Sequence, residues 1–374
     1  MGIAALNPFY ELLVAGKFIA MNEFDLIRRY FTRATPGALL GVGDDAALLQ
    51  VREGNVLAVS TDMLVSGTHF FADADPFLLG HKTLAVNLSD MAAMGATPRW
   101  ATLAIALPME HVTWADETWL EKFSAGFFSL ARQHGVELVG GDTTRGPLNL
   151  CVTIFGEVPA RQALRRSGAQ LGDEVWVSGT LGDAALALAH LQGRIVLDQA
   201  EFAACAPALH QPQPRVALGL ALRGIANSAI DISDGLLADL GHILDASQVG
   251  AQIDFFSLPV SSVMRGLLTP PGLPNPSQPP LVRGGAGEEL VSSPDKGRPG
   301  GVALLQQCIL SGGDDYELCF TVPVARHAEV LRIATQLDLP LTRIGKIVAG
   351  RGCIVHDATG KPLNPESGGY DHFQ

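Results

Sequence analysis

Six short motifs in this chain join aspartate to glycine, serine or threonine, and they stand at turns or beside apolar segments. They are GVGDD at 41–45, STD at 60–62, NLSD at 87–90, GGDTT at 140–144, DISDG at 231–235 and SGGDDYE at 311–317. One such aspartate is usually a turn residue or a helix N-cap and says little about function. Six of them demand a fold that places many carboxylates next to its apolar core.

Apolar segments of strand and helix type alternate along the chain, which indicates an α/β or α+β fold. VLAVSTD at 56–62 predicts a buried strand that ends on Asp62, and a long helix is expected up to Gly95 with Asp75 as its N-cap. Further strands are expected at 100–107, 136–142, 148–158, 316–322, 341–348 and 353–357, and further helices at 115–134, from 182 and at 234–246.

The length of 374 residues suits two domains. We expect an N-terminal domain at 22–158 and a C-terminal domain at 159–374, because a basic, glycine-bearing connector begins at 161. Residues 1–21 are an N-terminal extension, and Met21 is a candidate for the natural start. Residues 268–302 are dense in proline, glycine and serine, which predicts a disordered surface insertion.

Composition excludes several classes of protein. The formal net charge of −12 argues against nucleic-acid binding, because a phosphate backbone attracts a basic surface. No apolar run reaches the roughly 18 residues that span a bilayer, and the N-terminus lacks the basic region of a signal peptide. The five cysteines are scattered, which favours reduced thiols over disulfides or zinc. We therefore expect a cytoplasmic protein without membrane contact.

The aspartate motifs predict a cation site if the strands bring them to one edge of a sheet. Two carboxylates about 4 Å apart repel by about 4 kcal/mol at an effective dielectric near 20, and lysine is scarce near these motifs. Oxygen ligands suit Mg²⁺, which keeps coordination positions for substrate phosphates. Glycines in VGGDTTRG allow backbone N–H groups to approach a phosphate. Because P-loop and protein-kinase motifs are missing, we expect metal-dependent phosphate chemistry on another scaffold.

The same motifs, together with MNEFDLIRRYF, KTLAVNLSDMAAMGATP, NSAIDISDGLLADLGHI and the terminal GYDHF, resemble the thiamine-monophosphate kinase family. That family belongs to the aminoimidazole-ribonucleotide synthetase-like superfamily, and the resemblance covers residues 22–374 except the insertion. It implies a two-domain PurM-like fold with an N-terminal ATP-binding α/β domain that pairs in a homodimer. It also implies direct transfer of the γ-phosphate of ATP to thiamine monophosphate, with several Mg²⁺ ions and no covalent nucleophile.

The resemblance assigns roles to individual residues. Mg²⁺ ligands would be Asp45, Ser60, Thr61, Asp62, Asp90, Asp142, Asp231 and Asp234. Contacts to ATP would come from Gly141, Asp142, Arg166 and Ser233, and contacts to the thiamine substrate from His69, Asp314 and Tyr370. The family usually has glutamate where this chain has Asp314, which shortens the side chain by one methylene.

Other interpretations remain open at the level of sequence. Without the resemblance, His69 is more simply a satisfied surface histidine, Arg166 part of a solvated connector and Tyr370 a packing aromatic. Selenophosphate synthetases carry a reactive cysteine near a glycine-rich N-terminus, and hydrogenase-maturation relatives end in cysteine; this chain has neither feature. A metal-dependent phosphohydrolase and a non-enzymatic cation- or nucleotide-binding module are the alternatives from other functional classes.

Overall fold

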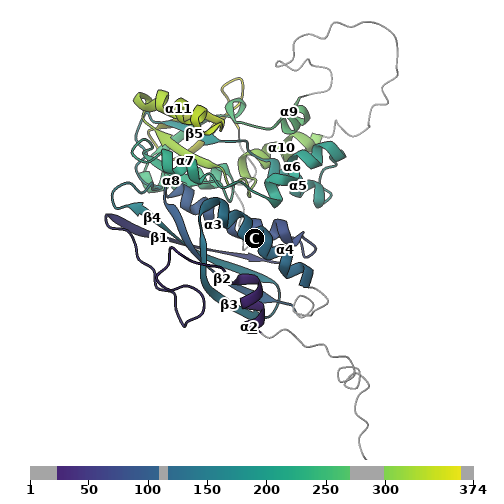
Figure 1. The fold of residues 1–374 in the computed structure, drawn as a ribbon. Helices are drawn as coiled ribbons and strands as arrows, with labels where there is room; N and C mark the ends of the chain where they lie inside the picture. The colour runs from purple at the N-terminus through teal and green to yellow at the C-terminus, as the bar shows by residue number, and fades with distance from the viewer. Residues whose placement is uncertain (1–22, 109–116, 270–298, 364–374) are drawn as a thin grey trace, which may run out of the picture. The chain divides into compact units, whose positions relative to one another are not determined.

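A computed structural model of the chain describes residues 23–108, 117–269 and 299–363 (Figure 1). The chain forms two compact units, and each combines helices with one sheet, as the sequence predicts. The first unit consists of Met1–Asn87 and Pro98–Glu157, and the second of Leu88–Thr97 and Val158–Gln374. A short segment of the N-terminal half therefore belongs to the second unit.

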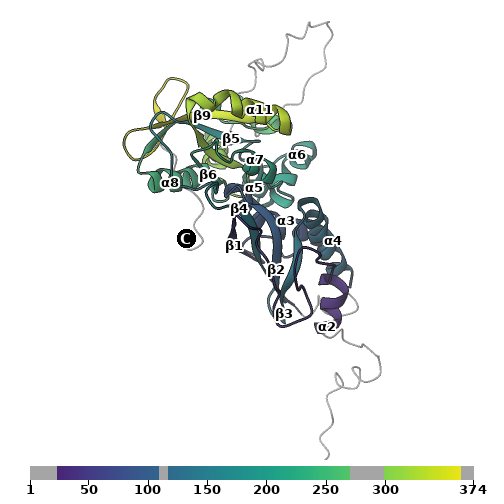
Figure 2. The ribbon, with the colours of Figure 1, turned by 60° about the vertical axis from the view of Figure 1, so that its left-hand side comes forward.

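The first unit contains a four-stranded sheet in the order β1-β4-β2-β3. Its strands are β1 (Asn55–Val65), β4 (Asn149–Pro159), β2 (Thr97–Leu107) and β3 (Glu137–Arg145). Helices α3 (Pro76–Ala93) and α4 (Glu117–His134) lie on one side of it (Figure 2). Before the sheet, the chain forms a short helix, α2 (Glu23–Leu26), which continues into the π-helical turn η1 (Ile27–Phe31).

Asp75 caps α3 as predicted, since its Oδ1 accepts the N–H groups of Phe77 and Leu78 at 2.9 and 3.1 Å. The helix-covered face of the sheet is apolar and buried; examples are Leu103, Ile105, Leu150 and Ile154. These alternate along β2 and β4 with less buried residues that point to the other face.

The prediction that VLAVSTD is a buried strand ending on Asp62 is wrong. Strand β1 is an edge strand, and it continues beyond Asp62 to Val65. Its residues Leu57, Val59 and Met63 are 42%, 54% and 52% exposed. The apolar composition of β1 therefore does not mean that its side chains are buried within the chain.

The second unit is built on a seven-stranded, largely antiparallel sheet in the order β11-β10-β7-β9-β5-β8-β6. Its strands are β5 (Glu174–Ser178), β6 (Ser228–Asp231), β7 (Gly250–Asp254), β8 (Leu318–Val322), β9 (Leu341–Val348), β10 (Gly352–His356) and β11 (Pro362–Leu363). Its helices are α5 (Asp183–Leu191), α6 (Gln199–His210), α7 (Val216–Ala221), α8 (Leu236–Ser247), α9 (Ser262–Leu268), α10 (Pro299–Ser311) and α11 (His327–Leu337), with 3-10 turns η4 (Phe255–Ser257) and η5 (Val324–Arg326).

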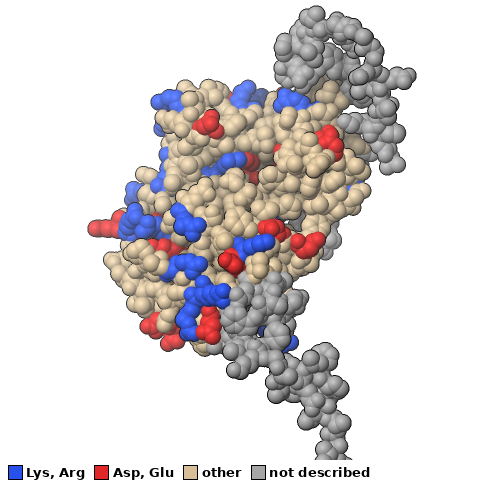
Figure 3. Space-filling model, turned by 45° about the vertical axis from the view of Figure 1, so that its right-hand side comes forward, with Lys and Arg blue, Asp and Glu red and all other residues tan. Residues whose placement is uncertain are grey.

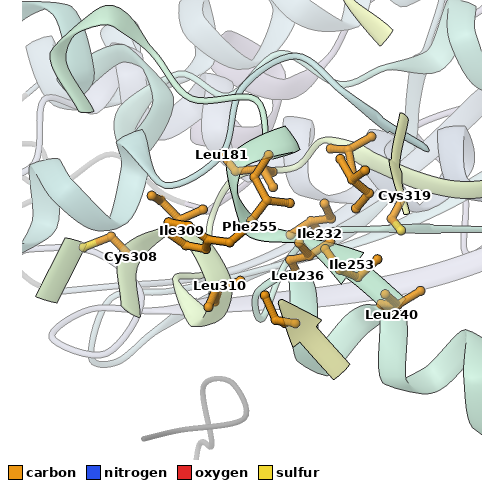
Figure 4. Close-up of a cluster of buried hydrophobic side chains, with 14 of the residues drawn as sticks. Leu181, Ile232, Leu236, Leu240, Ile253, Phe255, Cys308, Ile309, Leu310 and Cys319 are labelled. Atoms are coloured by element: carbon orange, nitrogen blue, oxygen red, sulfur yellow. The ribbon is translucent and has the colours of Figure 1, made fainter. Parts of the chain in front are cut away.

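Both faces of this sheet are covered, and every residue of β5 is buried. Val175 and Val177 belong to the apolar core that α5, α8 and α10 build, part of which Figure 4 shows around Ile232, Leu236 and Ile309. Trp176 points to the other face, where its ring lies 5.1 Å from that of His327 at the start of α11. Because successive side chains of β5 point to opposite faces of the sheet, Val175 and Trp176 pack into two separate layers.

Residues 88–97, which include the last turn of α3, are bound tightly within the second unit. Arg223 donates hydrogen bonds to the carbonyl of Gly95 at 2.5 Å and to the hydroxyl of Thr97 at 3.2 Å. A Cβ on Gly219 of α7 would lie 2.0 Å from the carbonyl oxygen of Ala92, so this close approach of the two backbones requires glycine.

The predicted insertion at 268–302 is wrong at both ends. Leu268 is the last residue of α9, and residues 299–302 lie in the first turn of α10. The part between them, 270–298, lies outside the described residues, as do residues 1–22 and Tyr370.

Within the described part of the chain, no helix is both long and apolar enough to cross a bilayer. On the face drawn in Figure 3, lysine and arginine side chains lie interspersed with aspartate and glutamate.

Candidate functional site

Asp90 and Asp231 bring two of the six motifs together within the second unit. Asp90 is in the last turn of α3, and Asp231 is the last residue of β6 and only 6% exposed. Burial, together with the negative charges of Asp90 and Asp239, raises the pKa of Asp231 to about 7. The two carboxylates are close enough to repel each other, and a divalent ion bound between them would relieve that repulsion.

The loop after Asp231 is organised by a carboxylate that sequence reasoning missed. Oδ2 of Asp239 accepts hydrogen bonds from the N–H groups of Ser233, Asp234 and Gly235 at 3.0, 3.0 and 3.1 Å. Asp239 is 3% exposed, and burial raises its pKa to about 7 although these donors act in the opposite direction. Its place in the first turn of α8, just after DISDG, was the available signal, because acidic residues there interact with unpaired N–H groups.

The motif at 311–317 packs directly on that loop. The N–H of Asp314 donates to the carbonyl of Ser233 at 2.9 Å, and the N–H of Tyr316 donates to the carbonyl of Ile232 at 2.8 Å. A Cβ on Gly313 would lie 2.6 Å from the Ser233 oxygen. Asp314 and Tyr316 have φ values of +68° and +49°. Hence the predicted residues Ser233 and Asp314, far apart in sequence, are neighbours.

The other acidic residues of this motif have structural partners inside the unit. Asp315 accepts the N–H of Gly182 at 3.0 Å, and burial raises its pKa well above its ordinary value. Glu317 accepts hydrogen bonds from Nε of Arg215 at 2.7 Å and from the hydroxyl of Ser178 at 2.5 Å. Asp315 and Glu317 therefore fix the loop, while Asp314 lies at its less buried end.

Asp62 and Asp142 are not brought together within one chain. They belong to β1 and β3, the two edge strands, with β4 and β2 between them. Three strand spacings amount to about 14 Å. Asp62 shares the face of the buried Leu64, two residues further along β1, and so points to the helix-covered face, whereas Asp142 pairs with Ala104 on the open face. The expectation that the strand ends converge fails for these two residues, because it assumed neighbouring parallel strands.

Asp45 lies in an exposed loop of the first unit, between the bridged residues Leu40 and Leu48. Its N–H donates to Oδ1 of Asp44 at 3.0 Å, and Gly43 has φ +127°. Asp44 thus stabilises the turn that presents Asp45. Among the residues that the structure describes, no three histidine, cysteine, aspartate or glutamate side chains form a group that could hold a metal ion.

The neighbouring predicted ligands on β1 point to different faces. Thr61 is exposed on the open face, where its hydroxyl lies 2.9 Å from that of Thr153 on β4. Ser60 alternates with Thr61 and shares the face of Asp62.

Gly141 occupies a position that only glycine fits. Its φ is +152°, and a Cβ would lie 1.9 Å from the carbonyl oxygen of Leu103. The adjacent residues Asp142 and Thr144 are exposed. No side chain therefore covers the backbone of β3 at Gly141.

Of the remaining predicted residues, His69 has a partner in its own turn. Its Nδ1 accepts the N–H of Val65 at 3.0 Å, so the neutral ring carries its proton on Nε2. The side chain of Arg166 is exposed, and its carbonyl accepts the hydroxyl of Ser247 at 3.3 Å.

Comparisons with known proteins agree with this architecture. The family models described as AIR synthase related protein, N-terminal and C-terminal domain, match residues 43–158 and 170–358. Thiamine-monophosphate kinase of Escherichia coli (strain K12) is 44% identical over 361 residues, which are 95% of this chain and 99% of the relative. The corresponding kinase of Haemophilus influenzae is 39% identical over 365 residues, 95% of this chain and 99% of the relative.

Solved structures give the same result. Thiamine-monophosphate kinase from Stenotrophomonas maltophilia K279a superposes with a TM-score of 0.71 and 47% identity, covering 88% of this chain and 93% of that one. AaThiL complexed with AMPPCP and TMP superposes with a TM-score of 0.67 and 28% identity, covering 94% and 96%. The hydrogenase maturation protein HypE, at 21% identity and a TM-score of 0.66, shares the fold.

Proposed function

Because the chain belongs to the thiamine-monophosphate kinases among the AIR synthase related proteins, we propose that it transfers the γ-phosphoryl group of ATP to thiamine monophosphate. The product is thiamine diphosphate, so the reaction is the last step of its biosynthesis. The acceptor is itself a phosphate, so the transfer proceeds in line and needs no covalent nucleophile on the protein.

The observation that carries the metal dependence is the buried pair Asp90 and Asp231. With a pKa of about 7, Asp231 is partly protonated at neutral pH, and Mg²⁺ at the pair would displace that proton and neutralise phosphate charge. Asp234, two residues after the buried Ile232, is the third candidate in this unit. Asp45, Ser60, Thr61, Asp62 and Asp142 stay predicted ligands for further Mg²⁺ ions.

ATP and the thiamine substrate engage the exposed backbone and loop residues. Gly141 and Asp142 present an uncovered part of the β3 backbone to a phosphate. The amide of Ser233 already donates to Asp239, so the contact of Ser233 with ATP is assigned to its side chain. Arg166 contributes an exposed guanidinium that suits phosphate oxygens. His69 and Asp314, with Tyr370, are proposed to contact the thiamine substrate.

We also propose that the enzyme is a homodimer joined through its N-terminal unit. Support comes from the open face of the four-stranded sheet, which exposes Leu57, Val59 and Met63 on the edge strand β1. Val59→Glu should yield a monomer by light scattering, whereas Val324→Glu, at another exposed apolar residue in the second unit, should not. A Val59→Glu protein with unchanged mass would contradict this interface.

A cytoplasmic location is proposed as well. All five cysteines are free, and two phosphorylated substrates with ATP as donor suit that compartment. Fractionation of the native cells with an antibody to the chain tests it, and recovery in a membrane pellet would contradict it.

The function is tested with purified protein, ATP, Mg²⁺ and thiamine monophosphate, following thiamine diphosphate by chromatography. Formation of thiamine diphosphate with one ADP per product supports the proposal. Consumption of ATP without thiamine diphosphate would instead identify a phosphohydrolase. Binding of Mg²⁺ or nucleotide without any turnover would identify a binding module.

A further inference from the structure

A single carboxylate oxygen holds the amide side of the loop between β6 and α8. Oδ2 of Asp239 accepts three successive N–H groups, those of Ser233, Asp234 and Gly235, within 3.1 Å. Three amides that converge on one atom fix three successive peptide planes. These planes set the direction in which the side chains of Ser233 and Asp234 leave the backbone.

The carbonyl side of the same loop is held independently. Asp314 donates its N–H to the carbonyl of Ser233 at 2.9 Å, and a Cβ on Gly313 would lie 2.6 Å from that oxygen. Gly235 has φ +118°, and a Cβ there would lie 2.7 Å from the backbone of Ser311. The carbonyl side of the loop therefore packs against several backbone groups of the 311–317 motif, whereas the amide side depends on one atom, Oδ2 of Asp239.

We propose that Asp239 is a positioning residue for phosphoryl transfer: it orients Ser233 and Asp234 toward the metal–nucleotide complex without touching it. The inference rests on the proposed function for the identity of the ligands. Replacing the carboxylate by a neutral amide, or displacing its oxygen, weakens all three hydrogen bonds at once, while the contacts from the 311–317 motif persist. The loop then keeps its place in the fold but loses its defined side-chain directions.

The test compares Asp239→Asn with Asp245→Asn, a matched control on the exposed side of the same helix. Three quantities are measured: amide hydrogen exchange at 233–235, the Kd for Mn²⁺ with AMPPCP by calorimetry, and the Kd for thiamine monophosphate. In Asp239→Asn we expect exchange at least about tenfold faster and Mn²⁺–AMPPCP binding at least about tenfold weaker. Thiamine monophosphate binding should change by less than about twofold, and the control should match the wild type.

If Asp239→Asn lowers only the melting temperature and binds Mn²⁺–AMPPCP like the wild type, the positioning role is overturned and the residue is merely structural. If the wild type itself does not bind Mn²⁺–AMPPCP, the proposed function fails, and this inference fails with it. Should Asp239→Asn not fold, Asp239→Glu keeps the charge and displaces the oxygen by one methylene. The same selective loss of nucleotide affinity is then expected, and unchanged affinity would overturn the inference.

Discussion

The hydroxyl of Tyr316 donates a hydrogen bond to Oδ1 of Asp314 at 3.1 Å, and both residues have positive φ. Aspartate tolerates this left-handed backbone better than glutamate does, because its short side chain forms local hydrogen bonds. The aspartate at this position thus coincides with a backbone conformation that suits it.

Asp314→Glu should therefore keep the affinity for thiamine monophosphate within about threefold, since the carboxylate is retained, while costing about 1 kcal/mol of stability. Calorimetric titration of the substrate and thermal unfolding measure the two effects. Tyr316→Phe serves as the control that removes the hydroxyl contact without changing the backbone. A complete loss of substrate binding in Asp314→Glu would show that the site depends on the shorter side chain.

Asp62→Asn should reduce turnover at least about a hundredfold while leaving the fold intact, because it removes one charge that neutralises a metal ion. Asp62 lies on an edge strand and is only partly buried, so unfolding is not expected. Steady-state rates and the melting temperature are compared with those of Asp73→Asn, at an exposed loop residue of the same unit. Equal activity of the two variants would rule out a metal role for Asp62.

Gly141→Ala should destabilise the protein by at least about 2 kcal/mol and abolish ATP binding, because a methyl group at φ +152° would collide with the Leu103 carbonyl. Gly140→Ala is the matched control one residue earlier, where the nearest atom to a Cβ is a Thr102 methyl at 3.7 Å. Denaturant unfolding and nucleotide titration separate the two. Comparable stability of both variants would mean that β3 relaxes easily at this point.

Asp231→Asn should stabilise the metal-free protein by an amount that grows with pH. The folded pKa of Asp231, about 7, exceeds its ordinary value of 3.8, so the folded state favours the protonated form. The stability that this carboxyl contributes is full below about pH 4 and is lost as the pH rises through 7. Asparagine stays neutral, so the variant should gain a few kcal/mol over the wild type by about pH 8.

Unfolding in EDTA between about pH 4 and pH 8 measures this difference between the two proteins. Added Mg²⁺ should narrow the gap by stabilising only the wild type. A difference that does not vary with pH would mean that Asp231 ionises normally in the folded state.

Local features of the fold were predictable from sequence. Asp75 followed by proline marks the start of α3, and LTRIGKIV coincides with β9, because capping chemistry and alternation are properties of neighbouring residues. The exposure of β1 was not predictable, since an apolar edge strand and a buried central strand have the same composition.

The candidate site divides in the same way. The sequence shows that DISDG and SGGDDYE are motifs of the same type, but it does not show that they touch. In the structure, Ser233 and Asp314 are joined by a hydrogen bond. The separation of Asp62 from Asp142 follows from the strand order, which no local pattern encodes. Asp239 was visible in the quoted motif, but its role depends on the geometry of three amides.

The assignment of residues 88–97 to the second unit has a consequence for any attempt to separate the halves. If the gene were cut at the connector near residue 160, residues 88–97 would be separated from the second unit to which they belong. The C-terminal fragment would then lack Asp90 and the backbone segment that Gly219 and Arg223 contact. The C-terminal half expressed alone would expose the surface of α7 that residues 88–97 normally cover. A chimaera of two paralogues joined at the connector would fold only if residues 88–97 of one parent fit α7 of the other, so the two halves are expected to evolve together.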